Sequence, residues 1–296
     1  MLEGEYVSVA RAWDFQREAG VSDVPVEIEK YLAFANVDLR ISFDLRDDEA
    51  GQTFPIGEGH IIVVNGHQSI ERQRFTVLHE LAHIRLELPS IHGQSISIDQ
   101  LLRYHIRPRE EILCDIFASE CLLPRQHFIV DVRKRPCTMQ SIQELADLYS
   151  ASLTATGSRF AAYNETPCAW LLADEGRIRY VSCSRTMREM GFFLNIGTQV
   201  PAKSVLGRLL VGTSNVTAGV PDIVPSYIWI NNDCRGCEEF TETSVGALGR
   251  SQGLALLVAE DVQPGAVLSR DALQDDDDLL PELDGILKFP DRKRRK

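Results

Sequence analysis

The spacing of apolar residues changes several times over the first 65 residues, and each change predicts a new element. Residues 24–35 carry apolar side chains at helical spacing after Pro25, a residue that suits the first turn of a helix. The run 61–65 predicts a strand, antiparallel to an earlier one. That earlier strand is predicted where apolar residues alternate with polar ones, as on a half-buried face: Val37, Leu39, Ile41 and Phe43.

Longer helical patterns with clear boundary residues follow these strands. Ser69 is placed to cap a helix over about 70–88, and a second helix is expected over about 108–123, between two prolines. Shorter helices are expected over 141–148 and 153–163. The helices expected over about 70–88 and 108–123 are long enough to pack against each other.

The pattern changes again after residue 167. Short β-like runs such as 178–183 and 254–258 alternate with frequent Gly and Pro, which indicates a second domain beginning after a boundary near 164–167. The acidic run 275–278 and the basic run 292–296 have opposite charge, and we interpret them as a solvated tail.

Composition excludes several classes of protein. The 296 residues and the 44% hydrophobic content are enough for two folded domains. A net charge of -12 disfavours direct binding of nucleic acid. No apolar run approaches the roughly 18 residues needed to span a membrane, so we expect a cytoplasmic protein without membrane contact. Seven scattered cysteines predict reduced thiols, and Cys234 and Cys237 are expected to lie in a turn.

The strongest chemical signal is the sequence His79-Glu-Leu-Ala-His83, an HExxH motif inside the predicted helix. Residues four apart lie on one face of a helix, so both imidazoles can ligate one metal ion. Glu80 then lies beside the ion and can take a proton from metal-bound water, whose pKa falls to about 7. The motif predicts a catalytic zinc site with His79 and His83 as ligands and Glu80 as the general base.

A chance match is the alternative interpretation of the motif. It would bury two imidazoles and a carboxylate among apolar neighbours with no metal to pair them, which is energetically costly. The residues around the motif therefore favour the metal site.

A third protein ligand must come from elsewhere in the chain, because Leu86 and Pro89 rule out the extended form HExxHxxGxxH. The second long helix begins with two acids, of which Glu111 is the preferred ligand and Glu110 the rival. Asp115 lies one turn after Glu111 and is placed to accept a hydrogen bond from a ligand histidine.

Substrate contacts are predicted less directly. Tyr104 or His105 is a candidate to stabilise the oxyanion of the tetrahedral intermediate, although a surface loop is the commoner role for such residues. The strand that ends with Val63, Val64 and Asn65 precedes the metal helix, so an exposed edge there would bind an extended peptide. An ordinary strand inside a sheet is an equal alternative for these three residues.

Three segments together resemble the ImmA/IrrE family of metallopeptidases. They are the strand 61–65, the segment 71–83 with the HExxH motif, and the segment 111–124, and the resemblance extends over about residues 24–163. In that family the second helix supplies a glutamate ligand three residues before a small residue. That small residue would be Cys114 here, which supports Glu111.

The resemblance implies an α+β, zincin-like and gluzincin-like fold, in which a small antiparallel sheet and helices carry the HExxH motif. Some members add a C-terminal GAF-like sensor domain of α/β type. The implied domains are a peptidase domain over 1–140, a helix-turn-helix-like region over 141–166, a GAF-like domain over 167–275 and the tail 276–296. The implied cofactor is Zn²⁺, with Mn²⁺ also acceptable.

The resemblance also implies a substrate, namely a helix-turn-helix repressor of XRE type whose cleavage releases stress-response or mobile-element genes. Two other functions stay open. The first is a DNA-binding regulator that uses the helices over 141–163, although the second of them carries Arg159 as its only cation. The second is a ligand sensor with a non-catalytic metal site.

Overall fold

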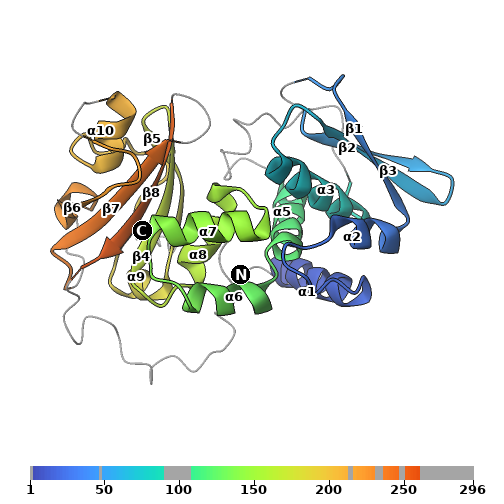
Figure 1. Ribbon diagram of the computed structural model, residues 1–296, viewed down its shortest axis with the longest axis horizontal. Coiled ribbons are helices and arrows are strands. Elements are labelled where there is room, and N and C mark those ends of the chain that lie inside the picture. The colour runs from blue at the N-terminus through green and yellow to red at the C-terminus, as the bar shows by residue number, and fades with distance from the viewer. Residues whose placement is uncertain are drawn as a thin grey trace, which may run out of the picture.

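The computed structural model describes residues 3–46, 49–89, 108–212, 216–230, 236–246 and 251–260. Within them the chain forms a small sheet with helices, a central group of helices, and a second, larger sheet, arranged in that order across the molecule (Figure 1). Tyr104, His105, Cys234 and the tail 276–296 lie outside the described residues.

The small sheet is mixed rather than antiparallel. Its strands are β1 (Val37–Ser42), β2 (Gly51–Ile56) and β3 (Gly59–Asn65), in the order β1-β3-β2. β3 pairs in antiparallel fashion with β2 but parallel with β1, so the predicted antiparallel pairing of the first and last strands is wrong. β2 was not predicted, and the tight turn at Gly57 sends β3 back between the other two strands, in the same direction as β1.

The apolar face predicted for β1 is largely exposed. Val37 is buried, whereas Leu39, Ile41 and Phe43 are 37%, 55% and 64% exposed. β1 is an edge strand of this sheet, and the buried apolar residues of the sheet lie instead on β3, where Ile62 and Val64 are almost fully covered. Alternation therefore located the strand correctly but not its degree of burial.

The helices around this sheet agree with the predicted positions in part. α2 (Ile28–Ala35) begins after Pro25 rather than with it, and α3 (Ile70–Arg85) begins after the Ser69 cap but ends before Leu88. Glu87 has a positive φ of 54°, which is incompatible with continuing the helix. α5 (Arg109–Leu122) lies where the second long helix was expected. α1 (Glu3–Glu18) and α6 (Arg125–Arg133) were not predicted.

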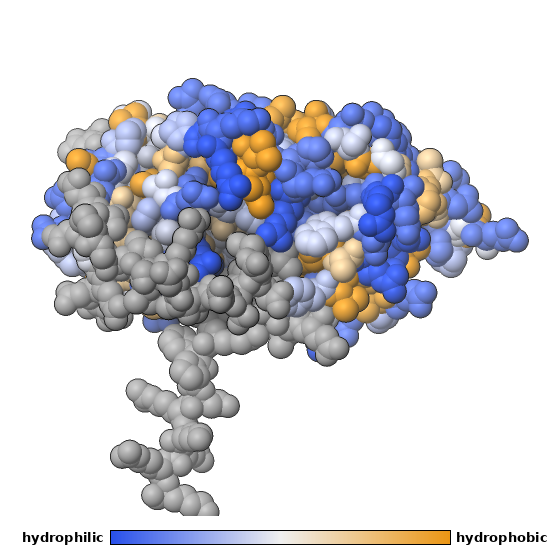
Figure 2. Space-filling model, turned by 90° about the horizontal axis from the view of Figure 1, so that it is seen from below, coloured by the Kyte–Doolittle hydropathy of each residue, from blue (hydrophilic) through white to orange (hydrophobic). Residues whose placement is uncertain are grey.

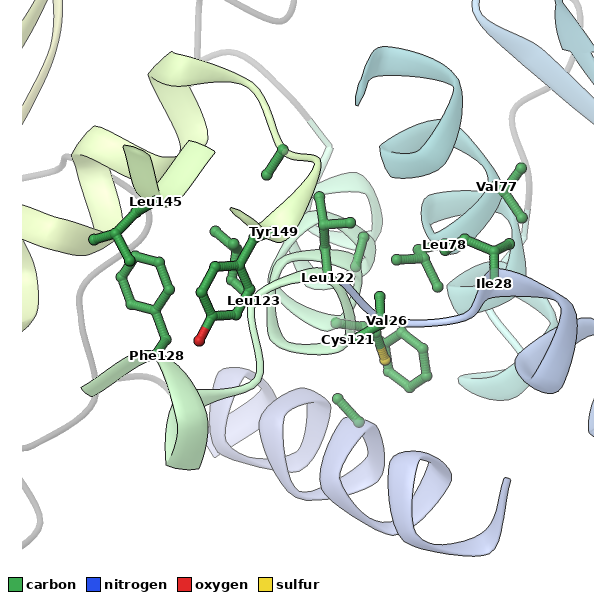
Figure 3. Close-up of a cluster of buried hydrophobic side chains, with 14 of the residues drawn as sticks. Val26, Ile28, Val77, Leu78, Cys121, Leu122, Leu123, Phe128, Leu145 and Tyr149 are labelled. Carbon is green, nitrogen blue, oxygen red and sulfur yellow. The ribbon is translucent and has the colours of Figure 1, made fainter. Parts of the chain in front are cut away.

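One hydrophobic core surrounds α5 (Figure 3). Leu78 and Val77 of α3 lie on one side of the end of α5, and Tyr149 lies on the other. Leu122, at the end of α5, is 1% exposed. On the remaining side α1 packs along α5, and the Ser8 hydroxyl donates to the Leu113 carbonyl over 2.6 Å. This packing fixes α3 and α5 relative to each other.

The two shorter helices are α7 (Met139–Tyr149) and α8 (Leu153–Tyr163), close to their predicted ranges. They lie between α5 and a five-stranded antiparallel sheet (Figure 1). The strands of this sheet have the order β5-β4-β8-β7-β6: β4 (Cys168–Asp174), β5 (Arg177–Cys183), β6 (Pro221–Pro225), β7 (Glu239–Gly246) and β8 (Gln252–Ala259).

Strand β4 is buried on both of its faces. Trp170 and Leu172 join the same core that surrounds α5, whereas Ala169 and Leu171 face a second core. The short helices α9 (Arg185–Glu189) and α10 (Val205–Val211) cover that second side. The helices packed around α5 and the larger sheet therefore share one continuous hydrophobic cluster through α8.

The contact between α8 and β4 depends on Gly157. A Cβ atom at this position would lie 2.3–2.5 Å from the ring of Trp170, which is fully buried. We expect Gly157→Ala to destabilise the fold by about 1–3 kcal/mol, because overpacking outweighs the better helix propensity of Ala. Chemical denaturation would measure this. Gly246→Ala is the control, since no atom of the described residues lies within 4 Å of the added atom, and an equal loss in both variants would contradict the packing argument.

Candidate metal centre

The two histidines of the HExxH motif and one glutamate converge between α3 and α5. His79 Nε2 lies 3.3 Å from His83 Nε2, because the two residues are one turn apart on α3. From α5, Glu111 Oε2 lies 3.2 Å from His79 Nε2, and Glu111 Oε1 lies 3.5 Å from His83 Nε2. Ligand atoms of all three residues are within 4.8 Å of one another.

All three side chains are buried, with 8%, 5% and 2% exposure for His79, His83 and Glu111. Burial lowers the pKa of His79, but hydrogen bonds with Asp115 and Glu111 outweigh it and raise that pKa to about 9. Burial, together with the neighbouring His79, lowers the pKa of His83. The two imidazoles therefore differ in proton affinity although they share one site.

Asp115 holds His79 from the side opposite the cluster. Its Oδ1 lies 2.8 Å from His79 Nδ1, while His79 Nε2 points toward Glu111. Asp115 lies one turn after Glu111 on α5, so the helix delivers one carboxylate to the cluster and another behind it. A carboxylate in this position fixes the tautomer and ring orientation of a ligand histidine.

The set of donors fits a divalent cation. Two imidazole nitrogens and one carboxylate oxygen are the protein ligands of many catalytic zinc sites, which leave a fourth position open. Three buried carboxylates, those of Glu80, Glu111 and Asp115, interact with His79 or lie beside it, so protonation of His79 alone would not balance their charge. A divalent cation bound between the ligand atoms would supply the opposite charge that buried carboxylates need. His79, His83 and Glu111 are the residues that would hold it.

Glu80 lies next to this cluster and is itself 5% exposed. The Thr53 hydroxyl, on β2, donates to Glu80 Oε2 over 2.6 Å. Thr53 was not singled out from the sequence, because the segment 51–56 contains a proline and too little alternation to indicate a strand. Only the folded chain brings this hydroxyl to α3.

Several expectations are decided by this geometry. Glu111 belongs to the cluster, whereas Glu110 is half-exposed and lies outside it. The exposed edge expected at Val63, Val64 and Asn65 is wrong, since β3 is the central strand and is paired on both sides. Asn65 also uses its side chain internally, donating to the carbonyls of Arg46 and Glu49 over 2.9 Å each.

One segment of the chain matches a known sequence family. Residues 37–161 match the family model of the peptidase M78 group, described as the IrrE N-terminal-like domain. This part of the chain is similar to an IrrE N-terminal-like domain. The IrrE-like domain contains both helices of the cluster and extends into α8, while α1 and the strands of the larger sheet lie outside it.

Similarity to solved structures extends beyond the IrrE-like domain. A transcriptional regulator from Mycobacterium tuberculosis superposes with a TM-score of 0.54 at 13% identity, covering 85% of this chain and 76% of that protein. At this identity the likeness concerns the fold alone. No curated protein matches the chain. Among the described helices, none has the length and apolar character to cross a membrane.

Replacing Asp115, which hydrogen-bonds to His79, should weaken metal binding without abolishing it. We expect Asp115→Asn to lower the affinity for Zn²⁺ by about 10–100-fold, as for other partners of ligand histidines. Calorimetric titration of the metal-free protein would measure the change. Asp147→Asn, an exposed change on α7, is the control, and equal affinities in the two variants would show that Asp115 does not support the ligand.

Proposed function

We propose that the protein is a metal-dependent endopeptidase with His79, His83 and Glu111 as metal ligands and Glu80 as the general base. The observation that carries this proposal is the convergence of the three ligand atoms within 4.8 Å, next to a fourth buried side chain, Glu80. We propose Zn²⁺ as the metal, and Mn²⁺ is compatible with the same donors. A bound divalent cation would supply a Lewis acid for the peptide carbonyl and the attacking water.

Glu80 would carry the proton in this reaction. A carboxylate next to the ion takes a proton from the attacking water and passes it to the leaving amine. Glu80 lies between the two histidines on α3 and interacts electrostatically with both of them, but it is not one of the three members of the cluster. This division separates metal binding from proton transfer and makes the two roles testable one at a time.

The substrate would bind to β2 rather than to β3. Among the described strands, β2 pairs only with β3, and we propose that its other edge receives an extended peptide. β2 also contacts α3 and carries Thr53, which bonds to the general base. A peptide added to this edge would run past Glu80.

The proposed substrate is a helix-turn-helix repressor of XRE type, as the family resemblance implies. Cutting it would release stress-response or mobile-element genes. The sheet β5-β4-β8-β7-β6 would act as a regulatory domain with a GAF-like role, and its link to the site is the core shared through α8.

A direct experiment would incubate the purified protein with the helix-turn-helix protein encoded beside it and map any products by mass spectrometry. We expect one cut, which a chelator abolishes and added Zn²⁺ or Mn²⁺ restores. Cleavage that persists after complete removal of the metal would contradict the metallopeptidase. Metal binding with no cleavage of any repressor would favour the ligand sensor with a non-catalytic site.

The structure gives no support to DNA binding through α8. Arg159, its only cation, is 1% exposed and pairs with the buried Glu120 of α5. α8 also packs under β4 and β5, which cover the face that a recognition helix would need. The coloured residues on the face shown in Figure 2 are mostly hydrophilic, with apolar side chains in separate groups. Salt-dependent binding of the protein to promoter DNA would reverse this conclusion.

A further inference from the structure

A hydrogen bond between Thr53 and Glu80 connects a strand of the small sheet with the helix that carries the metal-ligand histidines. Thr53 lies on β2, the strand proposed to receive the substrate, whereas Glu80 lies on the metal helix α3. The distance of 2.6 Å between Thr53 Oγ1 and Glu80 Oε2 is that of a short hydrogen bond from a hydroxyl to a carboxylate oxygen. When the carboxylate is ionised, as a general base must be, such a bond is about twice as strong as a neutral one.

Thr53 is itself firmly placed. Its backbone lies opposite Ile62 of the central strand, a residue with no exposed surface. Gly51 lets β2 approach α3 closely, since a Cβ atom there would lie 2.6 Å from Thr76 Cγ2. As a β-branched residue, Thr53 also has restricted χ1 rotation. The hydroxyl is therefore held at a defined point of the sheet.

We propose that Thr53 is a positioning residue for peptide hydrolysis, with its hydroxyl fixing the orientation of the Glu80 carboxylate toward the attacking water. This inference rests on the proposed function. The hydroxyl uses Oε2 and so limits rotation of the carboxylate about its last side-chain bond. A carboxylate that is already oriented toward the water can react without first rotating into place. Holding it in that orientation therefore raises the rate of the reaction.

The position of Thr53 predicts a specific kinetic pattern. Its side chain points to α3, whereas a peptide added to β2 would pair through the backbone at the strand edge. Loss of the hydroxyl should therefore lower kcat and leave KM unchanged, since it removes an interaction that acts during the reaction and not during binding. A purely structural hydroxyl would instead alter metal content or stability, with no selective effect on kcat.

The experiment compares Thr53→Val, Thr53→Ala and Thr53→Ser in the full chain, using a library of internally quenched decapeptides as the substrate probe. We expect Val and Ala to lower kcat by about 10–100-fold, part of the usual contribution of a general base, with KM and bound Zn²⁺ unchanged. Ser, which keeps the hydroxyl, should restore most of the rate. The control is Thr156→Val, the same change at a buried hydroxyl on α8.

A second measurement does not depend on turnover. Crystal structures of the metal-free Val and Ser variants should show the Glu80 carboxylate rotated in the first and held as in the native protein in the second. An unchanged carboxylate in the Val variant, or an unchanged kcat, would overturn the role of Thr53 while leaving the peptidase in place. A native protein that cleaves no peptide or repressor would overturn both proposals.

Discussion

Replacing Glu80 with Gln is expected to abolish peptide cleavage while bound metal stays in place. The amide has nearly the same shape as the carboxylate but cannot accept a proton from the attacking water. General acid–base groups contribute about 10²–10⁴-fold, so kcat should fall by at least about 100-fold. His79, His83 and Glu111 are untouched, so the metal content should match that of the native protein.

Turnover of the repressor and metal analysis of the same samples would test this expectation. Glu71→Gln is the matched control, because it makes the same change in the first turn of α3, away from the cluster. We expect it to retain native activity. Full activity of the Glu80 variant would refute the general-base mechanism, and loss of its metal would show that Glu80 supports the site rather than the reaction.

Replacing Glu111 with Gln should have the largest effect on the metal itself. The change removes the carboxylate from the cluster that Glu111 forms with His79 and His83, and leaves the two imidazoles as the remaining proposed ligands among the described residues. Loss of a side chain that hydrogen-bonds to a metal ligand lowers metal affinity by about 10–100-fold. Loss of the ligand itself should therefore lower metal affinity by more than about 100-fold. Cleavage should disappear at Zn²⁺ concentrations that saturate the native protein.

Glu110→Gln provides a control of the same chemistry at the neighbouring position. Glu110 is half-exposed on α5 and does not belong to the cluster, so its replacement should leave metal affinity and cleavage close to native values. Titration of both metal-free variants with Zn²⁺ would separate them. If Glu110→Gln proved to be the damaging change, the assignment of the third ligand from this geometry would be wrong.

Local patterns predicted α2, α3, α5, α7 and α8, and the approach of the two motif histidines to each other. The i, i+4 spacing of His79 and His83 needs only a helix to bring the imidazoles together, and the Ser69 cap marked where that helix begins. The helices over 108–123, 141–148 and 153–163 were likewise predicted from local sequence signals. Each of these signals depends on residues a few positions apart, which the sequence displays directly.

Strand pairing was predicted poorly because it depends on contacts between distant residues. β1, β2 and β3 follow one another in the chain, yet β3 lies between the other two and is parallel to β1. The alternation of apolar and polar residues predicts neither the exposure of Ile41 nor the burial of Val64, because the same pattern occurs in edge strands and in central strands of a sheet. The mistaken substrate edge on β3 has the same origin.

The sequence by itself determined that a helix presents two imidazoles and a carboxylate, and that an acidic helix further along the chain offers a third ligand. The tertiary structure decided that Glu111 rather than Glu110 reaches them, that Thr53 bonds to Glu80, and that Arg159 is buried against Glu120. The physical reason is the range of the interactions. Helical geometry is set within one turn, whereas packing of α5 on α3 and of β2 beside Glu80 arises only when the whole core closes.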